Sequence, residues 1–136
     1  MTVLVDIDVL IDIALRRLPW AFASRDFMNR CQAASIPVYV SWHSLATLFY
    51  YTSEQGKQTA RQAIRELLQY ARVVSVGHDD MKFALDQDLP DLEDAMQVAA
   101  AVACGAALIA TRNTKDYAKS VVPALTPSEL LKRLNK

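Results

Sequence analysis

The chain has 136 residues, 52% of them apolar, with three glycines and five prolines, which predicts one globular domain over residues 1–136 rather than a disordered chain. Its 15 Lys and Arg residues balance its 15 Asp and Glu residues, so no overall charge attracts it to nucleic acid or to a membrane surface. The sequence has no apolar run of membrane-spanning length. Cys31 and Cys104 lack metal-type spacing and predict buried thiols of a cytoplasmic protein.

Patterns typical of strands and helices alternate along the chain. The expected strands are residues 3–5, 37–40, 73–76, 107–110 and 121–122, and the expected helices are 9–18, 24–34, 41–56, 57–71, 79–88, 91–104 and 126–133. Ser24 and Ser41 are expected to be N-caps, and Gly105 is expected to end the Ala-rich helix. Strands separated by helices predict an α/β fold with a mostly parallel central sheet and helices on both faces.

Acidic residues follow the first strand. Asp6 comes directly after the apolar run Val3–Val5, and Asp8 lies two residues further on. Open α/β sheets bind ligands at the carboxyl ends of their strands, and an unpaired carboxylate is costly to bury. Asp6 is therefore expected either to cap the following helix or to contribute to a cation site.

Two more acidic groups lie beside strand and helix boundaries late in the chain. Asp91 and Asp94 share one face at the start of the Ala-rich helix, and Asp116 ends the polar loop after strand 107–110. Helix capping explains Asp91 and Asp94 by itself, and a loop acid is usually solvated. However, a strand end, a helix start and a loop after a strand can converge in one cleft, so Asp6, Asp94 and Asp116 are expected to meet there.

Converging carboxylates repel one another, and this repulsion raises pKa values unless a cation is bound. Oxygen ligands suit Mg²⁺ or Mn²⁺ better than zinc. Such an ion activates water and neutralises charge on a phosphodiester. The acids therefore predict metal-dependent phosphodiester hydrolysis, and they predict that Asp6→Asn or Asp94→Asn leaves the fold intact or stabilises it.

Four segments resemble successive motifs of the PIN-domain family, over essentially the whole chain. They are VLVDIDVLID at 3–12, DLEDAMQVAA at 91–100, ATRNTKDY at 110–117 and LTPSEL at 125–130. The resemblance implies a three-layer, Rossmann-like α/β/α nuclease domain that cleaves single-stranded RNA with Mg²⁺ or Mn²⁺. It also implies the toxin of a toxin–antitoxin pair, with an antitoxin as partner, and a homodimer.

The resemblance also assigns site residues by position. Asp8 stands where the family usually has Asn, which keeps an oxygen ligand and adds a negative charge. The catalytic and metal-binding acids of the family correspond to Asp6, Asp94 and Asp116, an accessory acid corresponds to Asp91, and polar residues that line the cleft correspond to Thr111 and Asn113.

One family acid is missing. Thr47 occupies the position at which the helix after the second strand usually supplies a Glu, and a neutral hydroxyl is a weaker ligand than a carboxylate. Asp8 can restore the lost charge, but only if its side chain reaches the ion. Two functions therefore remain open: an active endoribonuclease, and a degenerate PIN domain that binds RNA or a protein partner without cutting.

A phosphatase of the haloacid-dehalogenase type is a weaker alternative. The segment Asp6-Ile7-Asp8 is similar to the nucleophile motif of that family. The hydroxyl residue, the Lys and the late acidic motif that the family also needs have no recognisable counterpart in this sequence.

Overall fold

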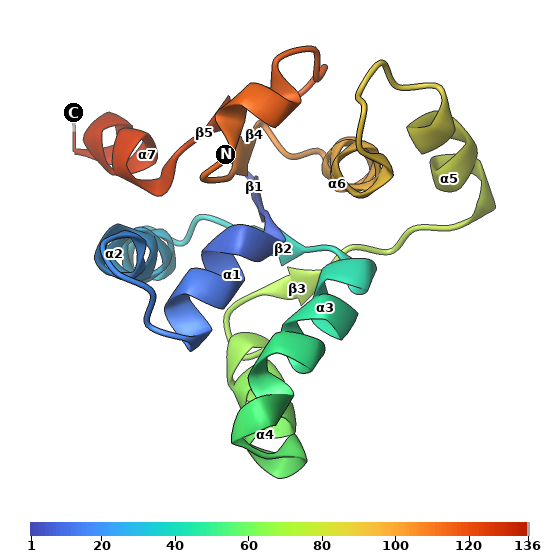
Figure 1. The fold of residues 1–136 in the computed structure, drawn as a ribbon. Coiled ribbons are helices and arrows are strands. Elements are labelled where there is room, and N and C mark those ends of the chain that lie inside the picture. The colour runs from blue at the N-terminus through green and yellow to red at the C-terminus, as the bar shows by residue number, and fades with distance from the viewer. Residues whose placement is uncertain (136) are drawn as a thin grey trace.

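Five strands form one parallel sheet at the centre of the computed structural model, which describes residues 1–135 (Figure 1). The strand order is β3-β2-β1-β4-β5, and all neighbouring pairs are parallel. The order changes direction between β1 and β4, and open α/β sheets bind ligands at such a switch point. The strands are β1 (Val3–Val5), β2 (Val38–Val40), β3 (Arg72–Val73), β4 (Leu108–Ala110) and β5 (Ala124–Leu125).

Helices cover both faces of this sheet, which confirms the predicted α/β fold (Figure 1). Within residues 1–135, none of them combines the length and the hydrophobicity that a transmembrane span requires. The helices are α1 (Ile7–Ala14), α2 (Trp20–Ala33), α3 (Trp42–Thr52), α4 (Lys57–Leu67), α5 (His78–Leu85), α6 (Leu92–Ala103) and α7 (Pro127–Leu134), and the short 3-10 turns are η1 (Ser53–Gln55) and η2 (Thr114–Tyr117).

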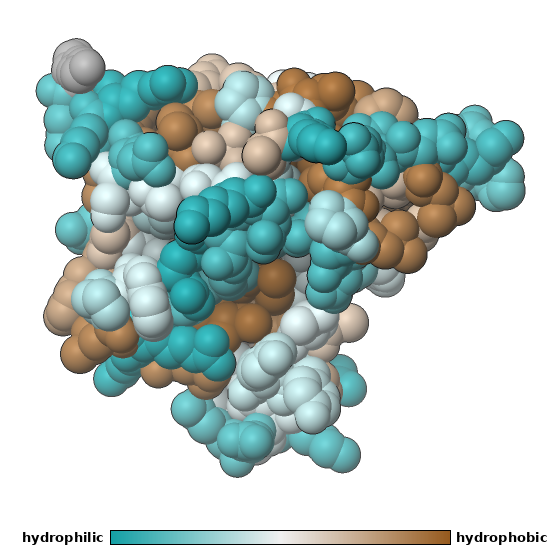
Figure 2. Space-filling model, turned by 45° about the horizontal axis from the view of Figure 1, so that its top comes forward, coloured by the Kyte–Doolittle hydropathy of each residue, from teal (hydrophilic) through white to brown (hydrophobic). Residues whose placement is uncertain are grey.

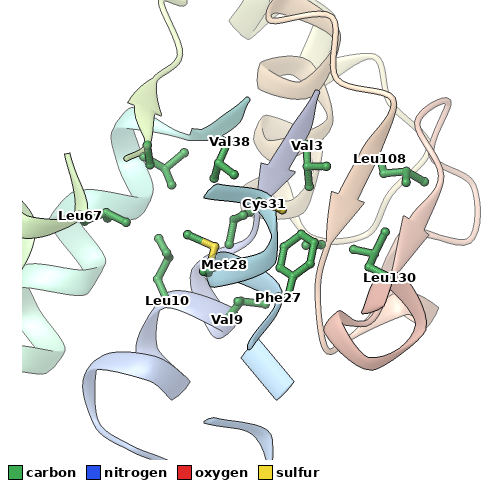
Figure 3. Packing of buried hydrophobic residues seen from close by; sticks show 14 of the residues in the cluster. Val3, Val9, Leu10, Phe27, Met28, Cys31, Val38, Leu67, Leu108 and Leu130 are labelled. Carbon is green, nitrogen blue, oxygen red and sulfur yellow. The ribbon is translucent and has the colours of Figure 1, made fainter. Parts of the chain in front are cut away.

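Alternating side chains of β1 divide the core into two layers. Val3 and Val5 face the larger layer, which contains Phe27 of α2 together with residues of α1 and α7 (Figure 3). Leu4 faces the opposite layer, where α6 and η2 pack against the sheet. All three β1 side chains are completely buried, and burying a Val or Leu side chain contributes roughly 1.5–3 kcal/mol. The hydrophobic strand therefore places whatever follows it, at Asp6, at the edge of the buried core.

Several predicted boundaries differ from the structure: the helix expected at 9–18 ends at Ala14, the strand expected at 73–76 is Arg72–Val73, and three further differences have a local cause. The second helix begins at Trp20, directly after Pro19, so Ser24 is buried within α2 and does not cap it. The first helix begins earlier than expected, at Ile7, because Asp6 caps it. The last strand is Ala124–Leu125 and not 121–122, because the Ser120 side chain hydrogen-bonds both backbone groups of Val122 and holds that segment in a bend.

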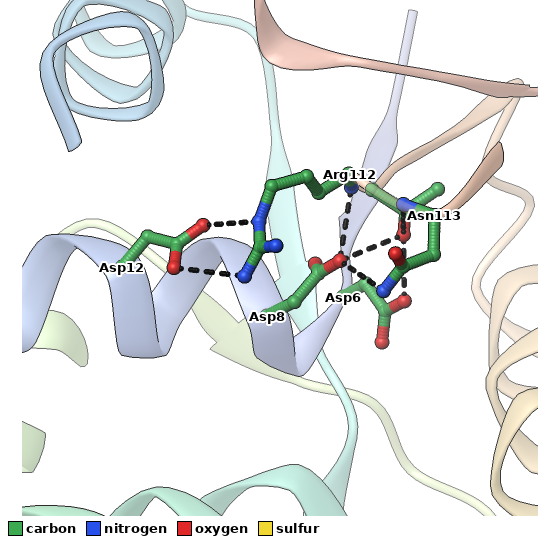
Figure 4. A network of polar contacts seen from close by, with 6 residues as sticks. Asp6, Asp8, Asp12, Arg112 and Asn113 are labelled. Carbon is green, nitrogen blue, oxygen red and sulfur yellow. Dashed lines mark hydrogen bonds and ion pairs between the residues drawn. The ribbon is translucent and has the colours of Figure 1, made fainter. Parts of the chain in front are cut away.

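An ion pair ties the loop after β4 to α1 (Figure 4). Nε and Nη2 of Arg112 lie 2.8 and 3.1 Å from the two carboxylate oxygens of Asp12, whose side chain is only 1% exposed. The Arg112 guanidinium carbon also lies 4.0 Å from the centroid of the Trp20 ring. This planar, two-pronged contact is one that Lys cannot reproduce. Arg112 thereby holds its neighbours Thr111 and Asn113 close to the first helix.

Loss of this ion pair should destabilise the fold. Removing one partner of a buried pair leaves an uncompensated charge, and because Arg112 is partly exposed we expect Arg112→Met to lower the free energy of unfolding by about 2–3 kcal/mol. Arg112→Lys should recover part of this loss. Urea denaturation measures both. In the control Lys119→Met, the lost partner Asp88 is largely exposed, so the change should stay below about 1 kcal/mol; equal losses in both Met variants would contradict a structural role for Arg112.

Candidate functional site

Asp6 lies at the centre of a polar cluster where β1 ends. Its side chain is 4% exposed, and each of its oxygens accepts two hydrogen bonds. Oδ1 accepts from the Ile7 backbone N–H at 2.8 Å and from Gln97 Nε2 at 2.9 Å. Oδ2 accepts from the hydroxyls of Thr111 and Tyr117 at 2.8 and 2.9 Å. Asp6 therefore caps α1, as one expectation had it, and its hydrogen-bonding capacity is fully used by the protein.

Gln97 connects this carboxylate to the start of α3. The Gln97 side chain is 1% exposed, and its amino group donates to Asp6 and, at 2.8 Å, to the Ser44 hydroxyl. Its carbonyl oxygen accepts from the Ser41 hydroxyl. Ser41 stands at the N-cap position of α3, but its hydroxyl binds Gln97 and makes no capping hydrogen bond, which corrects the prediction. The amide thus joins β1, α3 and α6 at one point.

Tyr117 connects Asp6 to Asp94. Its buried hydroxyl lies 2.9 Å from Asp6 Oδ2 and 3.2 Å from Asp94 Oδ1. Burial and the two negative charges raise the pKa of Tyr117, so the hydroxyl keeps its hydrogen at neutral pH. Since it has only that one hydrogen, it can donate to only one carboxylate at a time.

Asp94 is a half-buried acid of the cluster and lies in the first turn of α6. Its backbone N–H donates to Asp91 Oδ1 at 3.3 Å, so Asp91 is the N-cap of this helix. Burial, followed by the charges of Asp6, Asp91 and Asp116, raises the pKa of Asp94 from 3.8 to about 6. Asp91 and Asp116 are exposed, and within the described chain neither makes a hydrogen bond to Asp6. Asp94 is therefore electrostatically coupled to all three acids, and Asp116 lies at the outer edge.

Asp8 organises the loop after β4 (Figure 4). Its Oδ2 accepts hydrogen bonds from the Arg112 backbone N–H and from Asn113 Nδ2, both at 3.0 Å. The same oxygen lies 3.2 Å from the Thr111 hydroxyl, whose one hydrogen is donated to the nearer Asp6 Oδ2. Its Oδ1 is buried and has no partner among residues 1–135. Burial and the charge of Asp6 raise the pKa of Asp8 from 3.8 to about 7. Thr111 and Asn113 thus lie beside Asp8.

Thr47 makes no hydrogen bond to these acids in the described part of the chain. Its hydroxyl lies 3.5 Å from the carbonyl oxygen of His43, one turn earlier in α3. Thr47 follows Ser44 by three residues, so the two lie on the same face of the helix. The position at which the family usually has Glu is therefore on a helix that contacts the cluster, but the residue there supplies no charge.

Sequence reasoning did not identify Gln97 and Tyr117 as members of the site. Gln97 carries a signal in retrospect, because it is a long polar residue in an otherwise small and apolar stretch, three residues after Asp94. Tyr117 ends the segment ATRNTKDY at 110–117, and an aromatic residue beside a strand is usually part of the core. Only the fold reveals that its ring packs in the core while its hydroxyl lies between two carboxylates.

The site fits the expected divalent ion only in a hydrated form. The unpartnered Oδ1 of Asp8 and the raised pKa values of Asp8 and Asp94 are what a cation would relieve. However, no group of three or more acidic, His or Cys side chains in residues 1–135 is arranged to hold a metal, and both oxygens of Asp6 are occupied by donors. Mg²⁺ commonly keeps several waters and uses one or two carboxylates, and Asp94, with Asp116 nearby, suits that mode.

The same contacts change the expected effect of Asp6→Asn. An Asn side chain would direct an amino group toward donors that now point at a carboxylate, so this variant should lose about 1–3 kcal/mol of stability. This expectation corrects the prediction that Asp6→Asn leaves the fold intact or stabilises it by relieving repulsion among the acids. Asp94→Asn, which relieves repulsion at a half-buried position, should leave the melting temperature unchanged or raise it. Thermal melts of both variants test this, with Asp26→Asn on exposed α2 surface as the control; a melting temperature of Asp6→Asn equal to that of the control would disprove it.

Stability should also depend on pH. Asp8 and Asp94 have higher pKa values in the folded chain than in the unfolded chain, so the folded state binds protons more tightly. Their contribution to stability is fully present below about pH 4 and is lost as the pH rises through about 6 to 7. In EDTA, the melting temperature should therefore rise on going from about pH 8 to about pH 6. Protonation of His43, whose pKa is lowered by burial, opposes this rise in melting temperature. The decisive result is therefore that the melting temperature of Asp8→Asn depends less on pH than that of wild type.

Comparisons with known proteins agree with this fold. A family model described as PIN domain matches residues 2–115. Among curated proteins, no sequence matches the chain. Six chains of solved structures match it. One belongs to the crystal structure of VapBC2 from Rickettsia felis bound to a DNA fragment from their promoter, with 12% identity, a TM-score of 0.72, and coverage of 93% of this chain and 98% of that one. At this identity the likeness supports the fold alone. Because the family model spans most of the sequence, the chain belongs to the PIN-domain family, whose members are generally nucleases that use divalent metal ions.

Proposed function

We propose that this PIN domain is an endoribonuclease that cleaves single-stranded RNA by phosphodiester hydrolysis with Mg²⁺ or Mn²⁺. The observation that carries the proposal is the position of Asp94. It is a half-buried carboxylate whose pKa is raised to about 6 by burial and by three neighbouring acids. It shares the Tyr117 hydroxyl with Asp6, which follows β1 at the switch point of the sheet. A group with these properties binds a cation or a proton readily.

Each site residue has a distinct part in this proposal. A bound ion would supply an activated water and would neutralise charge on the phosphodiester, and Asp94 and Asp116 would hold it, with Asp91 beside them. Asp8 adds negative charge next to Asp6, and its position is held by the loop after β4. Asp6 fixes the start of α1 and the positions of the side chains around it, and Asn113 is exposed at the rim, where it can hydrogen-bond substrate.

Local groups must attract RNA, because the net charge is zero. Arg61 and Arg65 of α4 line a groove of about 480 Å³ together with Trp42 and Phe49 of α3. The Trp42 side chain is largely exposed and follows Ser41 of the polar cluster directly. Arginine beside aromatic rings is suited to phosphate pairing and base stacking on single strands. The groove therefore supports RNA as the substrate.

A PIN domain that binds RNA or protein without cutting is the second candidate. Two observations favour it: Thr47 supplies no carboxylate, and the donors around Asp6 leave no oxygen lone pair for an ion. The two candidates differ in whether the acidic cluster binds a divalent ion with useful affinity.

We further propose that the chain acts in the cytoplasm as the toxin of a toxin–antitoxin pair and that it forms a homodimer. The likeness to a chain of VapBC2 supports this role. Large apolar side chains are also strongly exposed, and hydrophobic patches flank the hydrophilic centre of the face in Figure 2; such patches commonly mark protein interfaces. The most exposed of these residues are Leu18, Phe22, Trp42, Tyr50, Leu85 and Val121. Growth arrest on expression, relieved by a gene encoded next to it, would support the toxin role.

A cleavage assay tests the nuclease. Wild-type protein with Mg²⁺ or Mn²⁺ should cut mixed single-stranded RNAs, and EDTA should abolish cutting. Asp94→Asn should reduce the rate at least about 100-fold, because it removes a charge from the ion site. Asp26→Asn makes the same chemical change on exposed α2 surface and should cut like wild type. If Asp94→Asn cuts as fast as Asp26→Asn, the activity does not arise from this cluster.

Thr47→Glu separates the two candidates. It restores a carboxylate on the α3 face that contacts the cluster. If the wild type binds metal poorly and does not cut, while Thr47→Glu does both, the natural protein is the non-cutting form. If the wild type cuts and Thr47→Glu changes little, Asp8 already supplies the missing charge.

A further inference from the structure

Four donors surround Asp6, and they differ in how firmly they are held. The Ile7 N–H belongs to the first turn of α1, so it cannot leave without unwinding the helix. Thr111 is fully buried, and its hydroxyl oxygen also accepts from the Asn113 N–H at 3.1 Å. Gln97 and Tyr117, in contrast, reach Asp6 with the tips of long side chains. Each oxygen is therefore contacted by one donor on the backbone or on a short side chain and by one donor at the end of a long side chain.

The two donors on long side chains, Gln97 and Tyr117, stand where an ion would have to bind. A carboxylate oxygen binds Mg²⁺ through a lone pair at about 2.0–2.1 Å, and the second lone pair of each Asp6 oxygen points at Gln97 Nε2 or at the Tyr117 hydroxyl, 2.9 Å away in both cases. The N–H and O–H dipoles direct their positive ends at this space, so they oppose a cation there. Tyr117 has another acceptor available, because Asp94 Oδ1 lies 3.2 Å from the same hydroxyl.

We propose that Gln97 and Tyr117 form a donor latch on Asp6, in which their amide and hydroxyl hydrogens take the place of a divalent ion, so that Asp6 can ligate an ion only after one of them lets go. The proposal rests on the proposed function for the identity of the ion. It makes Gln97 and Tyr117 positioning residues, since they act through Asp6. The latch holds the ion-free site in one arrangement and lowers its affinity for metal.

The alternative is that both side chains are purely structural partners of a buried carboxylate, which always needs donors. Both views predict that removing a donor destabilises the ion-free protein. They differ in metal affinity, because only a latch competes with the ion. A structural partner that is removed would leave the affinity for metal unchanged or weaken it by loosening the site.

Mn²⁺ binding to three variants tests the latch, with isothermal titration calorimetry as the readout. Tyr117→Phe removes only the hydroxyl and keeps the ring that packs in the core, and Gln97→Met keeps a side chain of similar length without its hydrogen-bonding groups. Tyr39→Phe is the matched control, because the Tyr39 ring packs against the same core layer and its hydroxyl makes no hydrogen bond to the acids in the described chain. Melting temperatures in EDTA confirm that each variant is folded.

Tyr117→Phe should bind Mn²⁺ about tenfold more tightly than wild type, the equivalent of one hydrogen bond to a charged group. Gln97→Met should also bind more tightly, although with a larger fall in melting temperature because Ser41 and Ser44 lose their partner. Tyr39→Phe should bind like wild type. Unchanged or weaker binding in a folded Tyr117→Phe overturns the latch, as does a failure of all variants to bind millimolar Mn²⁺. RNA cleavage, measured separately, decides the nuclease proposal, because a latch can exist in a protein that binds the ion and does not cut.

Discussion

A buried carboxylate at the end of the central strand is the constraint on which this structure depends. Asp6 follows the hydrophobic strand β1 and has almost no access to water, so the protein must supply the hydrogen bonds that water would otherwise make. It does so with four donors from separate segments: the first turn of α1, the end of β4, helix α6 and the turn η2. Because all four donors hydrogen-bond the Asp6 side chain, Asp6 also fixes the positions of these segments relative to one another.

Two other acids near the start of the chain extend this arrangement outward. Asp8 receives the backbone and side-chain donors of the loop after β4, and Asp12 receives the guanidinium of Arg112 from the same loop. The three acids of the first motif therefore all contact residues 111–117, about a hundred positions later in the chain. The acids at the start of the sequence therefore hold residues 111–117 in place, in addition to any part they have as ligands.

Structural and chemical roles compete for the same oxygens in this site. Each hydrogen bond that stabilises Asp6 without an ion must be displaced before that oxygen can bind one. Asp94, in contrast, is half exposed and has no side-chain donor near it in the described chain except the Tyr117 hydroxyl that it shares with Asp6. The chain belongs to a nuclease family and shares its fold with a chain only 12% identical. A fold of this kind hosts a site without guaranteeing its activity.

The local sequence pattern was sufficient to predict much of the fold of this protein. The alternation of strands and helices predicted the parallel α/β sheet, and the capping role of Asp91 and the helix after Thr126 followed from short-range signals that the structure retains. Predicted boundaries of helices and strands were wrong where a longer-range or unusual contact overrode the local structural propensity of the residues. Ser24 has the chemistry of a cap but lies inside α2, and the Val121–Val122 pair is bent by the Ser120 hydroxyl.

The sequence by itself determined which acids are present, and the order of its motifs indicated that they belong to one site. Only the tertiary structure decided which of them have free oxygens. Whether a carboxylate faces water, a cation or a protein donor depends on side chains brought from distant segments, such as Gln97 and Tyr117 around Asp6. No spacing rule encodes those contacts, because they arise where β1, α6 and η2 meet, and the periodicity of each element reports only which of its faces is buried.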